Sequence, residues 1–301
     1  MSPRNVEFRT LDGLALRGLF YTTGKPQQPC IIMTHGFAGR KEQFLPDFAE
    51  RFLDAGYAVL LYDNRNWGES EGTPRNEVDP FYQARDYFQA FNYAASLSEV
   101  DQTKIVYWGT SMSGGTALYA ASIDKRIRGV IVQVPFVTDE YLQARQRQIL
   151  PLLSSTQPHT EGGSAPAMLN TTAESVEEAT SGLSRAALPH PDVFVFLDEI
   201  KRRGIVPLEK QVTLQSLLNL SNFDPKSFLH RIAPTPLLMV AVDNDVTVPT
   251  LSQLQAFQIA LEPKSLAIIR GAGHFEVYIG EKFEENVAIQ LKFLDSLFSE
   301  K

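Results

Sequence analysis

The chain has 301 residues, of which 44% are hydrophobic and 21% charged, and its formal net charge is −7 at neutral pH. This composition is that of an ordinary globular protein, and it excludes a collagen-like, low-complexity or strongly basic nucleic-acid-binding chain. No apolar run reaches membrane-spanning length and the first residues lack the apolar core of a signal peptide, so we expect no membrane span and a cytoplasmic location. The single Cys30 opens an apolar run and is expected to be a buried thiol.

Apolar runs that suit buried strands alternate with stretches whose apolar residues recur every three or four positions, as in helices. The first two runs, residues 6–13 and 15–23, flank a turn at Asp12-Gly13 and predict an antiparallel hairpin. The whole pattern predicts a mostly parallel, eight-stranded α/β sheet flanked by helices. The six later strands are expected within residues 29–36, 57–64, 104–111, 127–136, 236–243 and 265–273, and clear helical patterns cover residues 41–56, 79–97 and 283–298.

The alternation of strands and helices breaks once, between the sixth and seventh predicted strands. Residues 154–184 are rich in Ser, Thr, Gly and Glu and poor in large apolar side chains, which predicts a mobile or irregular excursion. We therefore expect residues 1–136 and 234–301 to form the core, and residues 137–233 to form a helical cap inserted after the sixth strand. Helical patterns within this cap cover residues 139–153, 191–204 and 213–232.

The segment GTSMSGG, residues 109–115, directly follows a predicted strand. In the GxSxG turn a nucleophilic serine sits between a strand end and a helix start, and the residues two before and two after it must be small because the two backbones nearly touch. Centred on Ser111, the turn has Gly109 before it and Ser113 after it, so another small residue replaces one glycine. If the turn were centred on Ser113 instead, the preceding strand would have to continue through Gly109 and Thr110. We therefore expect Ser111 to be the nucleophile, with Ser113 as a small packing residue and as the alternative.

A nucleophilic serine needs an acid and a base, which follow it in the chain in the order acid, then histidine, in proteins built on this turn. The seventh strand leads to Asp243 and Asp245 and the eighth to His274, and both strand ends lie on the carboxyl side of the predicted parallel sheet. Two glycines before His274 allow its loop to bend tightly. Asp245 is the preferred acid because it lies in the loop, whereas Asp243 belongs to the strand end and remains the alternative.

An oxyanion hole needs two backbone N–H groups, one from the residue after the nucleophile and one from the loop after the third strand. Met112 is expected to supply the first, and Phe37 in the segment THGF is expected to supply the second. His35 in the same segment is interpreted as a residue that orders the loop. Four aromatic residues are candidates to line an apolar acyl pocket: Trp67, Phe136, Phe194 and Tyr278.

The motifs THGF, YDNRNWGESEG, GTSMSGG, DNDVTVP and GAGHF occur in an order and at spacings that resemble those of the α/β-hydrolases along nearly the whole chain. More narrowly, YDNRNWGESEGTPRNEVDP, VTLQSLLNL and HRIAPTPLLMVAVDNDVTVP are similar to the fungal polyketide transferase and thiohydrolase group, itself similar to the X-Pro dipeptidyl-peptidase-like hydrolases. The resemblance implies the α/β-hydrolase fold and release of an acyl chain by hydrolysis, lactonisation or transfer to an alcohol. It also implies the carrier protein of a polyketide synthase as a partner. The basic cluster Lys201–Arg203, with Arg145 and Arg147, offers either a docking surface for that acidic carrier or a solvated helix face.

The sequence therefore predicts a serine-dependent acyl-transfer enzyme whose Ser111 attacks a thioester or ester carbonyl. There is no P-loop, no strand-GxGxxG-helix unit and no His or Cys cluster at metal-ligand spacing, so neither a cofactor nor a metal is expected. Two alternatives stay open: a general carboxylesterase or peptidase-like serine hydrolase, and a non-catalytic small-molecule receptor on the same fold. Such receptors often lack a triad member, whereas this chain carries all three candidates.

Overall fold

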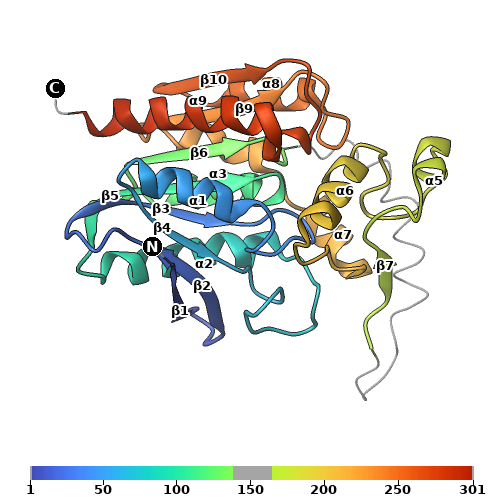
Figure 1. Cartoon of the computed structure of the whole chain (residues 1–301), viewed down its shortest axis with the longest axis horizontal. Coiled ribbons are helices and arrows are strands. Elements are labelled where there is room, and N and C mark those ends of the chain that lie inside the picture. Colours follow the sequence, from blue (N-terminus) through green and yellow to red (C-terminus); the bar gives the residue numbers. More distant parts are fainter. Residues whose placement is uncertain (1, 138–164, 300–301) are drawn as a thin grey trace.

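The computed structural model describes residues 2–137 and 165–299, and these residues form an eight-stranded sheet with helices on both faces (Figure 1). The strand order is β1-β2-β4-β3-β5-β6-β9-β10. β2 runs antiparallel to both of its neighbours, and every other neighbouring pair is parallel. The predicted hairpin and the mostly parallel, eight-stranded sheet are therefore confirmed. The strands are Arg4–Arg9 (β1), Ala15–Tyr21 (β2), Gln28–Thr34 (β3), Ala58–Tyr62 (β4), Val100–Thr110 (β5), Gly129–Gln133 (β6), Leu237–Val242 (β9) and Lys264–Ile269 (β10).

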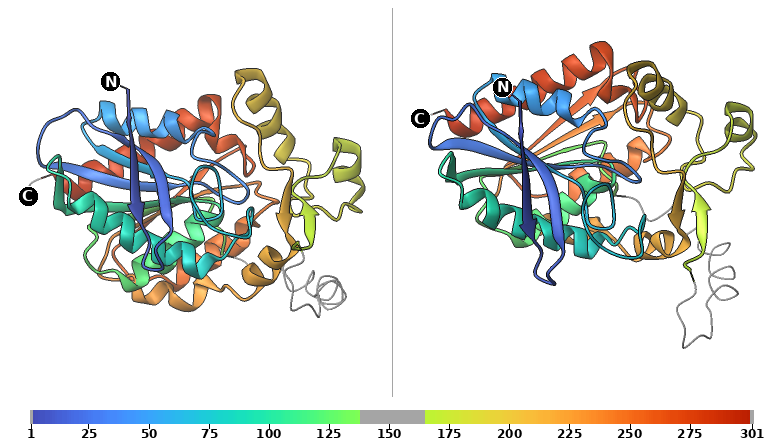
Figure 2. Two further views of the ribbon diagram at one scale, coloured as in Figure 1. Left: turned by 90° about the horizontal axis from the view of Figure 1, so that it is seen from below. Right: turned by 60° about the horizontal axis from the view of Figure 1, so that its bottom comes forward.

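Helices cover the two faces of the sheet in separate layers, which Figures 1 and 2 show from three sides. α2, α3 and α8 pack into the apolar core on one face, and α1 and α9 pack into the core on the other. Every residue of β4, β6 and β9 is buried, because a central parallel strand contacts helices on both sides. The helices are Leu45–Asp54 (α1), Pro80–Ala95 (α2), Met112–Ile123 (α3), Thr250–Ile259 (α8) and Gly280–Phe298 (α9), with a short 3₁₀ helix at Glu276–Tyr278 (η2).

Between β6 and β9, the described residues 165–233 add no strand to the main sheet, and we call them the inserted segment. Its two short strands pair with each other in antiparallel fashion. Figures 1 and 2 show β7, α5, α6 and α7 together beyond the ends of the parallel strands. The elements are Met168–Asn170 (β7), Val176–Ser181 (α5), Val193–Arg203 (α6), Gln211–Thr213 (β8), Leu214–Ser221 (α7) and the 3₁₀ helix Pro225–Arg231 (η1).

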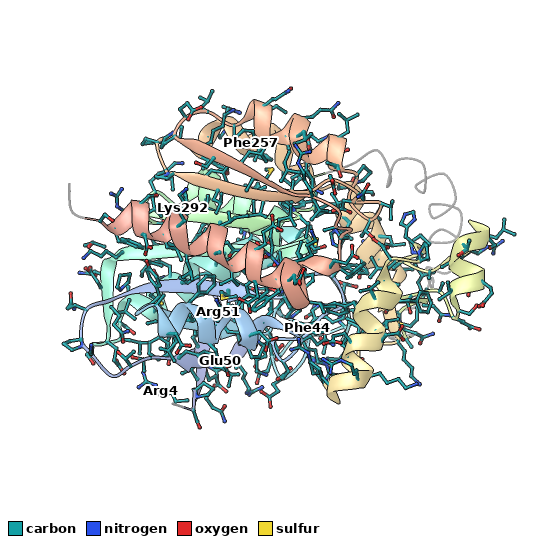
Figure 3. The ribbon with its side chains drawn as sticks, turned by 45° about the horizontal axis from the view of Figure 1, so that its top comes forward. Arg4, Phe44, Glu50, Arg51, Phe257 and Lys292 are labelled. Carbon is teal, nitrogen blue, oxygen red and sulfur yellow. The ribbon has the colours of Figure 1, made fainter. Side chains whose placement is uncertain are left out.

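The inserted segment is attached to the core by apolar packing. The Phe196 ring of α6 lies 4.7 Å from the ring of Phe44, which precedes α1 and is labelled in Figure 3. The same Phe196 ring lies 5.4 Å from Phe275 and 5.5 Å from Tyr278, on the chain that follows β10. α6 therefore packs against the loops that follow the parallel strands.

The expectation of an irregular excursion over residues 154–184 is wrong where the structure describes it, because β7 and α5 begin after residue 165. Ser175 caps α5 by accepting a hydrogen bond from Glu178 N at 3.2 Å, and the Glu178 carboxylate accepts one from Glu174 N at 2.8 Å. Gly182 then ends the helix at φ 70°. The polar composition of residues 154–184 therefore did not indicate the capped helix α5. The helical pattern predicted over residues 139–153 lies outside the described residues.

The helical pattern predicted over residues 213–232 is interrupted in the structure. α7 ends at Ser221, and η1 begins at Pro225 after Asp224 has capped it by accepting from Lys226 N at 3.0 Å. A proline lacks the N–H that would continue the helix, which explains the break. Within the described residues, no helix combines the length and the apolar character needed to cross a membrane.

Candidate active site

Ser111 is the single residue between the end of β5 and the start of α3. Its φ of 52° and ψ of −118° lie outside the ordinary regions for a residue with a side chain. The backbone is held there because Ser111 N donates to Gln133 O at 3.0 Å and Phe136 N donates to Ser111 O at 2.7 Å. A Cβ atom added to Gly109 would lie 2.2 Å from the carbonyl oxygen of Ser113, so only glycine fits two residues before Ser111. These features are those of a strained nucleophile turn.

Ser113, the alternative nucleophile, has a different environment. Its side chain is buried, and its Oγ accepts from Thr110 N at 2.9 Å. The hydroxyl proton can go to Thr34 O at 2.8 Å or to Thr110 O at 3.0 Å. Ser113 therefore joins the nucleophile turn to the end of β3, and it is more than the small packing residue that the sequence predicts.

Asp245 and His274 approach Ser111 from the loops that follow β9 and β10, which lie beyond β6 in the sheet. His274 Nδ1 donates to Asp245 Oδ2 at 2.8 Å, which leaves Nε2 to accept the Ser111 hydroxyl proton at 2.9 Å. Asp245 is held in turn by Val248 N, which donates to Oδ1 at 2.7 Å, and by Gln253 Nε2, which donates to Oδ2 at 2.8 Å. Both His274 and Asp245 are buried. The structure thus brings the three predicted residues into one continuous chain of hydrogen bonds.

Asp243, the alternative acid, does not take part in this chain. It is exposed, and its carboxylate accepts from Asn244 Nδ2 at 3.0 Å and from Ala272 N at 3.3 Å. It therefore holds the loop that leads to His274 and does not contact the imidazole.

Burial and nearby negative charges have opposite effects on the pKa of His274. Burial lowers the pKa of His274, but the charge of Asp245, the hydrogen bond to it and the charge of Asp192 together raise it above the ordinary histidine value. Asp192 lies just before α6 and accepts from Thr247 Oγ1 at 3.1 and 3.2 Å. The inserted segment thus brings a second carboxylate near the histidine, which sequence patterns did not indicate.

The two predicted oxyanion donors flank Ser111. Met112 is the first residue of α3, where helical N–H groups have no intrahelical acceptor. Phe37 lies in the loop after β3, and a Cβ added to its neighbour Gly36 would lie 3.2 Å from Ser111 Cβ, so this loop passes close to the serine. Among the described residues, neither the Phe37 N–H nor the Met112 N–H donates a hydrogen bond. Both groups are therefore available to an oxygen bound beside Ser111.

Two cavities meet at Ser111, and both are lined by Phe37 and Leu188. The first, which we call the histidine cavity, is also lined by His35, Gly36, Gly39, Arg40, Gln43, Leu45, Thr110, Phe196, Leu208, His274, Phe275 and Tyr278. The second, which we call the apolar cavity, is also lined by Met112, Phe136, Ala187, Leu217, Leu220, Thr247 and Val248. The core and the inserted segment therefore both contribute walls.

The four aromatic residues predicted for the pocket have different positions. Phe136 lines the apolar cavity and Tyr278 lines the histidine cavity. Trp67 lines neither, because it is buried in an apolar cluster with its Nε1 donating to Glu77 O at 3.0 Å. Phe194 also lines neither, and it is a half-buried residue that packs against the same apolar cluster as Val193, Phe196 and Ile200. Phe196 is the cavity residue of this helix.

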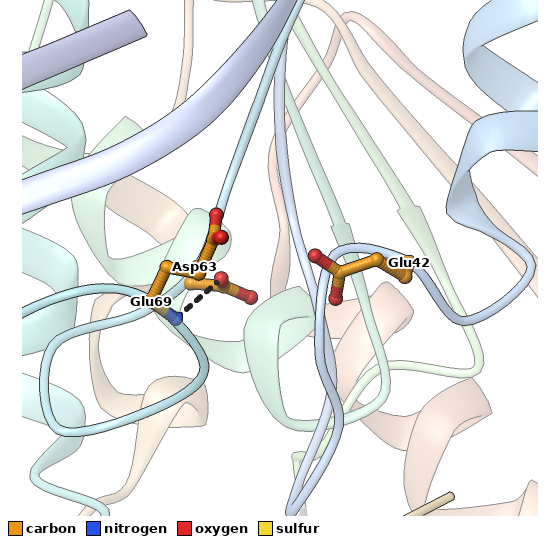
Figure 4. Close-up of side chains that lie close together, drawn as sticks. All are labelled: Glu42, Asp63 and Glu69. Carbon is orange, nitrogen blue, oxygen red and sulfur yellow. Dashed lines mark hydrogen bonds between the residues drawn. The ribbon is translucent and has the colours of Figure 1, made fainter. Parts of the chain in front are cut away.

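The acidic side chains of Glu42, Asp63 and Glu69 lie close enough together to suggest a metal site (Figure 4). However, the ammonium group of Lys41 lies 2.7 Å from a carboxylate oxygen of each of the three. The Lys41 side chain is only 2% exposed, so the cation that balances these charges is already part of the chain. The group does not fit a metal site.

Comparisons with known proteins agree with this geometry. Residues 29–280 match the family model of the alpha/beta hydrolase fold. A thiohydrolase of Eupenicillium brefeldianum is 33% identical over 310 residues, which cover 98% of this chain and 94% of the relative. The polyketide transferase grgF of a Penicillium species is 34% identical over 293 residues, covering 97% and 96%. The crystal structure of the alpha/beta hydrolase GrgF from Penicillium sp. sh18 covers 100% of both chains with a TM-score of 0.89 and 31% identity.

These matches extend over nearly the full length of each chain, and they confirm the resemblance drawn from the motifs. The chain belongs to the α/β-hydrolase family, in the group of its fungal thiohydrolase and polyketide transferase relatives.

Proposed function

We propose that this protein is a serine-dependent acyl-transfer enzyme that takes a polyketide acyl chain from a thioester and releases it by hydrolysis, lactonisation or transfer to an alcohol. The observation that carries the proposal is the chain of contacts from Asp245 through His274 to Ser111, at 2.8 and 2.9 Å. The printed names of the relatives, thiohydrolase and polyketide transferase, support the substrate class.

In the first half-reaction Ser111 Oγ attacks the thioester carbonyl carbon while His274 Nε2 takes the hydroxyl proton. Asp245 keeps the imidazole oriented and stabilises its positive charge. The carbonyl oxygen becomes an oxyanion that the N–H groups of Phe37 and Met112 hold. When the tetrahedral intermediate collapses, the C–S bond breaks, and the leaving sulfur takes the proton from His274. An acyl ester of Ser111 remains.

In the second half-reaction His274 Nε2 takes a proton from the acceptor, whose oxygen attacks the acyl-Ser111 carbonyl. Water gives the free acid, a hydroxyl on the acyl chain gives a lactone, and a separate alcohol gives an ester. The proton then returns from His274 to Ser111 Oγ. The protein ends the cycle unchanged in each case, so the acceptor alone decides the product.

The two cavities suit the two sides of the reacting carbonyl. His274 must protonate the leaving group and deprotonate the acceptor, so both belong in the histidine cavity. The acyl chain then extends into the apolar cavity, where Met112, Phe136 and Leu217 are among the lining residues. Residues 137–233 serve as a cap over this site, and the described part already contributes walls to both cavities.

A carrier protein of a polyketide synthase is the proposed donor of the thioester. In the basic cluster at the end of α6, Arg202 and Arg203 bind Glu199 at 2.5 and 2.7 Å, so their charges are already partly balanced. Arg203 also binds Asp47 of α1 at 2.5 Å. Arg145 and Arg147, the other members of the predicted cluster, lie outside the described residues. The carrier is therefore tested through its substrate and not through this cluster: an acyl chain on its carrier should react faster than the same chain on a small thiol.

The test of the function is direct. The protein is incubated with a panel of acyl thioester mimics, and mass spectrometry identifies both the acylated residue and the released product. We expect an acyl adduct on Ser111 and its turnover to acid, lactone or ester. An unmodified chain, or an adduct elsewhere, would refute the proposed mechanism.

A further inference from the structure

The loop that carries Phe37 is attached to the core by two residues that the proposed reaction does not use. This loop, residues 35–43, follows β3, and we call it the oxyanion loop. Asp63 and Asn64 directly follow β4, the strand beside β3 in the sheet. The ends of these two parallel strands therefore place Asp63 and Asn64 beside the loop.

Asn64 and Asp63 are hydrogen-bonded to the two ends of the oxyanion loop. At its start, Asn64 N donates to His35 Nε2 at 3.1 Å and Asn64 Nδ2 donates to His35 O at 3.1 Å. Towards its end, Lys41 N donates to Asp63 Oδ1 at 2.8 Å. Phe37 lies between these two points of attachment.

The oxyanion loop needs such support because its own conformation is not one that a peptide prefers. Ala38 has a φ of 57°, a left-handed conformation that costs a residue with a side chain about 1 to 2 kcal/mol. Within the loop, Gly39 N donates to Gly36 O at a long 3.3 Å, and Gln43 N donates to Arg40 O at 3.1 Å. The loop also passes close to Ser111, so a small displacement would move the Phe37 N–H relative to the serine.

The attachment at Asp63 is a buried ion pair. The Asp63 side chain is fully buried, and Lys41 Nζ donates to Asp63 Oδ2 at 2.7 Å. Glu69 N adds a third hydrogen bond to this carboxylate at 3.0 Å, shown as the dashed line in Figure 4. A Cβ added to Gly68 would lie 2.2 Å from Asp63 Oδ2, so the surrounding chain closes tightly around the carboxylate. Glu42 and Glu69 are 41% and 69% exposed, so solvent screens their attraction for Lys41 more than that of Asp63.

We propose that Asp63 and Asn64 are positioning residues for the oxyanion hole, and that Lys41 supplies the charge that lets Asp63 hold the loop from inside the protein. This inference rests on the proposed function, because it assigns a donor role to the Phe37 N–H. Loss of the attachment lets Phe37 move relative to the reacting carbonyl. A misplacement of about 1 Å at a reacting centre can lower a rate about 100-fold.

The test compares Asp63→Asn and Asn64→Ala with a control variant, Asp86→Asn. Asp86 is also buried and ion-paired, accepting from Arg65 at 2.6 and 2.7 Å, but it binds α2 to the chain after β4 and does not contact the oxyanion loop. Three quantities are measured: kcat and KM for a short acyl thioester, the affinity for a boronic acid that forms a tetrahedral adduct with Ser111, and the melting temperature.

We expect kcat to fall about 10- to 100-fold in Asp63→Asn and by a smaller factor in Asn64→Ala, with boronic acid affinity falling in parallel and KM changing less. Asp86→Asn should lower the melting temperature without lowering kcat. Unchanged kcat in a folded Asp63→Asn, or an equal loss in Asp86→Asn, overturns the positioning role. If Asp63→Asn does not fold, Asn64→Ala decides, and an unchanged kcat there overturns it. A wild-type protein that forms no adduct at Ser111 would instead refute the proposed function itself.

Discussion

Ser111 Oγ and His274 Nε2 lie 2.9 Å apart although 163 residues separate them in the chain. They meet because β5 and β10 are strands of one parallel set, whose carboxyl ends lie at the same edge of the sheet. The strained turn at Ser111 then points its hydroxyl out of that edge. The contact is thus a product of topology together with one unusual backbone conformation.

The first prediction separates the two serines of the nucleophile turn. Ser111→Ala should abolish covalent labelling by a fluorophosphonate, because the probe needs a serine oxygen that His274 can deprotonate. Ser113→Ala should keep labelling, because Ser113 Oγ bonds to the backbone of β3 and of its own turn. It should still lower the free energy of unfolding by about 1 kcal/mol, since a buried hydrogen-bonded hydroxyl is lost. Equal loss of labelling in two folded variants would contradict the choice of Ser111.

The second prediction concerns the acid. Asp245→Asn should lower kcat about 10⁴-fold, the loss seen when the acid of a serine protease triad is changed in this way. Asp243→Asn should have a small effect, because Asp243 is exposed and its carboxylate accepts from Asn244 Nδ2 and from Ala272 N, not from His274. The comparison is made on kcat for one thioester with both variants folded. The reverse ranking would move the acid role to Asp243.

The third prediction is a pH profile. His274 must be neutral to accept the serine proton, so activity should rise with pH through an apparent pKa above the ordinary histidine value of about 6.5. Asp192→Asn should lower this apparent pKa, because it removes one of the charges that raise the pKa of His274. The measurement is kcat/KM from pH 5 to 9 for both proteins. A flat profile would argue against His274 as the base.

The same shift has a consequence for stability. Because folding raises the pKa of His274, its protonation stabilises the folded protein below the unfolded-state pKa of about 6.5. This contribution is lost as the pH rises through the folded-state pKa. The difference in unfolding free energy between wild type and His274→Gln should therefore shrink as the pH increases across that window, which denaturant titrations at several pH values can follow.

The fourth prediction is that activity survives a metal chelator. In the part of the chain that the structure describes, Glu42, Asp63 and Glu69 form the acidic group with metal-ligand spacing, and the Lys41 ammonium lies 2.7 Å from a carboxylate oxygen of each of them. Dialysis against EDTA should leave kcat for a thioester unchanged. Loss of activity that returns on adding a divalent cation would mean that the reaction uses a metal.

The sheet could be predicted from the sequence because its central strands are continuous apolar runs, such as the buried β9. The nucleophile turn could also be predicted from the sequence. The steric contact that makes Gly109 necessary is with Ser113, which is only four residues further along the chain. Local patterns carried these features because local sterics and burial produce them.

Other parts of the site depend on contacts that no local pattern reports. The hydrogen bond from Lys41 to Asp63 joins residues 22 apart, and Asp192 approaches Thr247 across 55 residues. Phe194 and Phe196 look alike in the sequence, and only the packing of α6 on Phe44 decides that Phe196 faces the cavity. α5 was missed although its capping box, Ser175 to Glu178, is a recognisable signal.

The last prediction concerns the acyl chain. The apolar cavity is lined mainly by carbon-rich side chains, and each methylene buried there contributes about 0.8 kcal/mol, or about a fourfold gain in kcat/KM. The walls of this cavity bound the space for the chain, so the gain should level off once the acyl chain fills it. We therefore expect kcat/KM to rise from acetyl to medium acyl thioesters and then reach a plateau.

A variant that fills the apolar cavity tests whether that cavity holds the acyl chain. Leu217→Trp should move the plateau to shorter chains, whereas Leu208→Trp, in the histidine cavity, should leave the chain-length preference in place and weaken reaction with bulky leaving groups or acceptors. The measurement is kcat/KM across an acyl series from acetyl upward, with products separated into acid, lactone and ester. Because the acceptor must enter the histidine cavity, a bulky residue in that cavity should also change the ratio of acid, lactone and ester. A preference for acetyl, or for an aminoacyl-proline substrate, would contradict polyketide release and leave a serine hydrolase of another specificity.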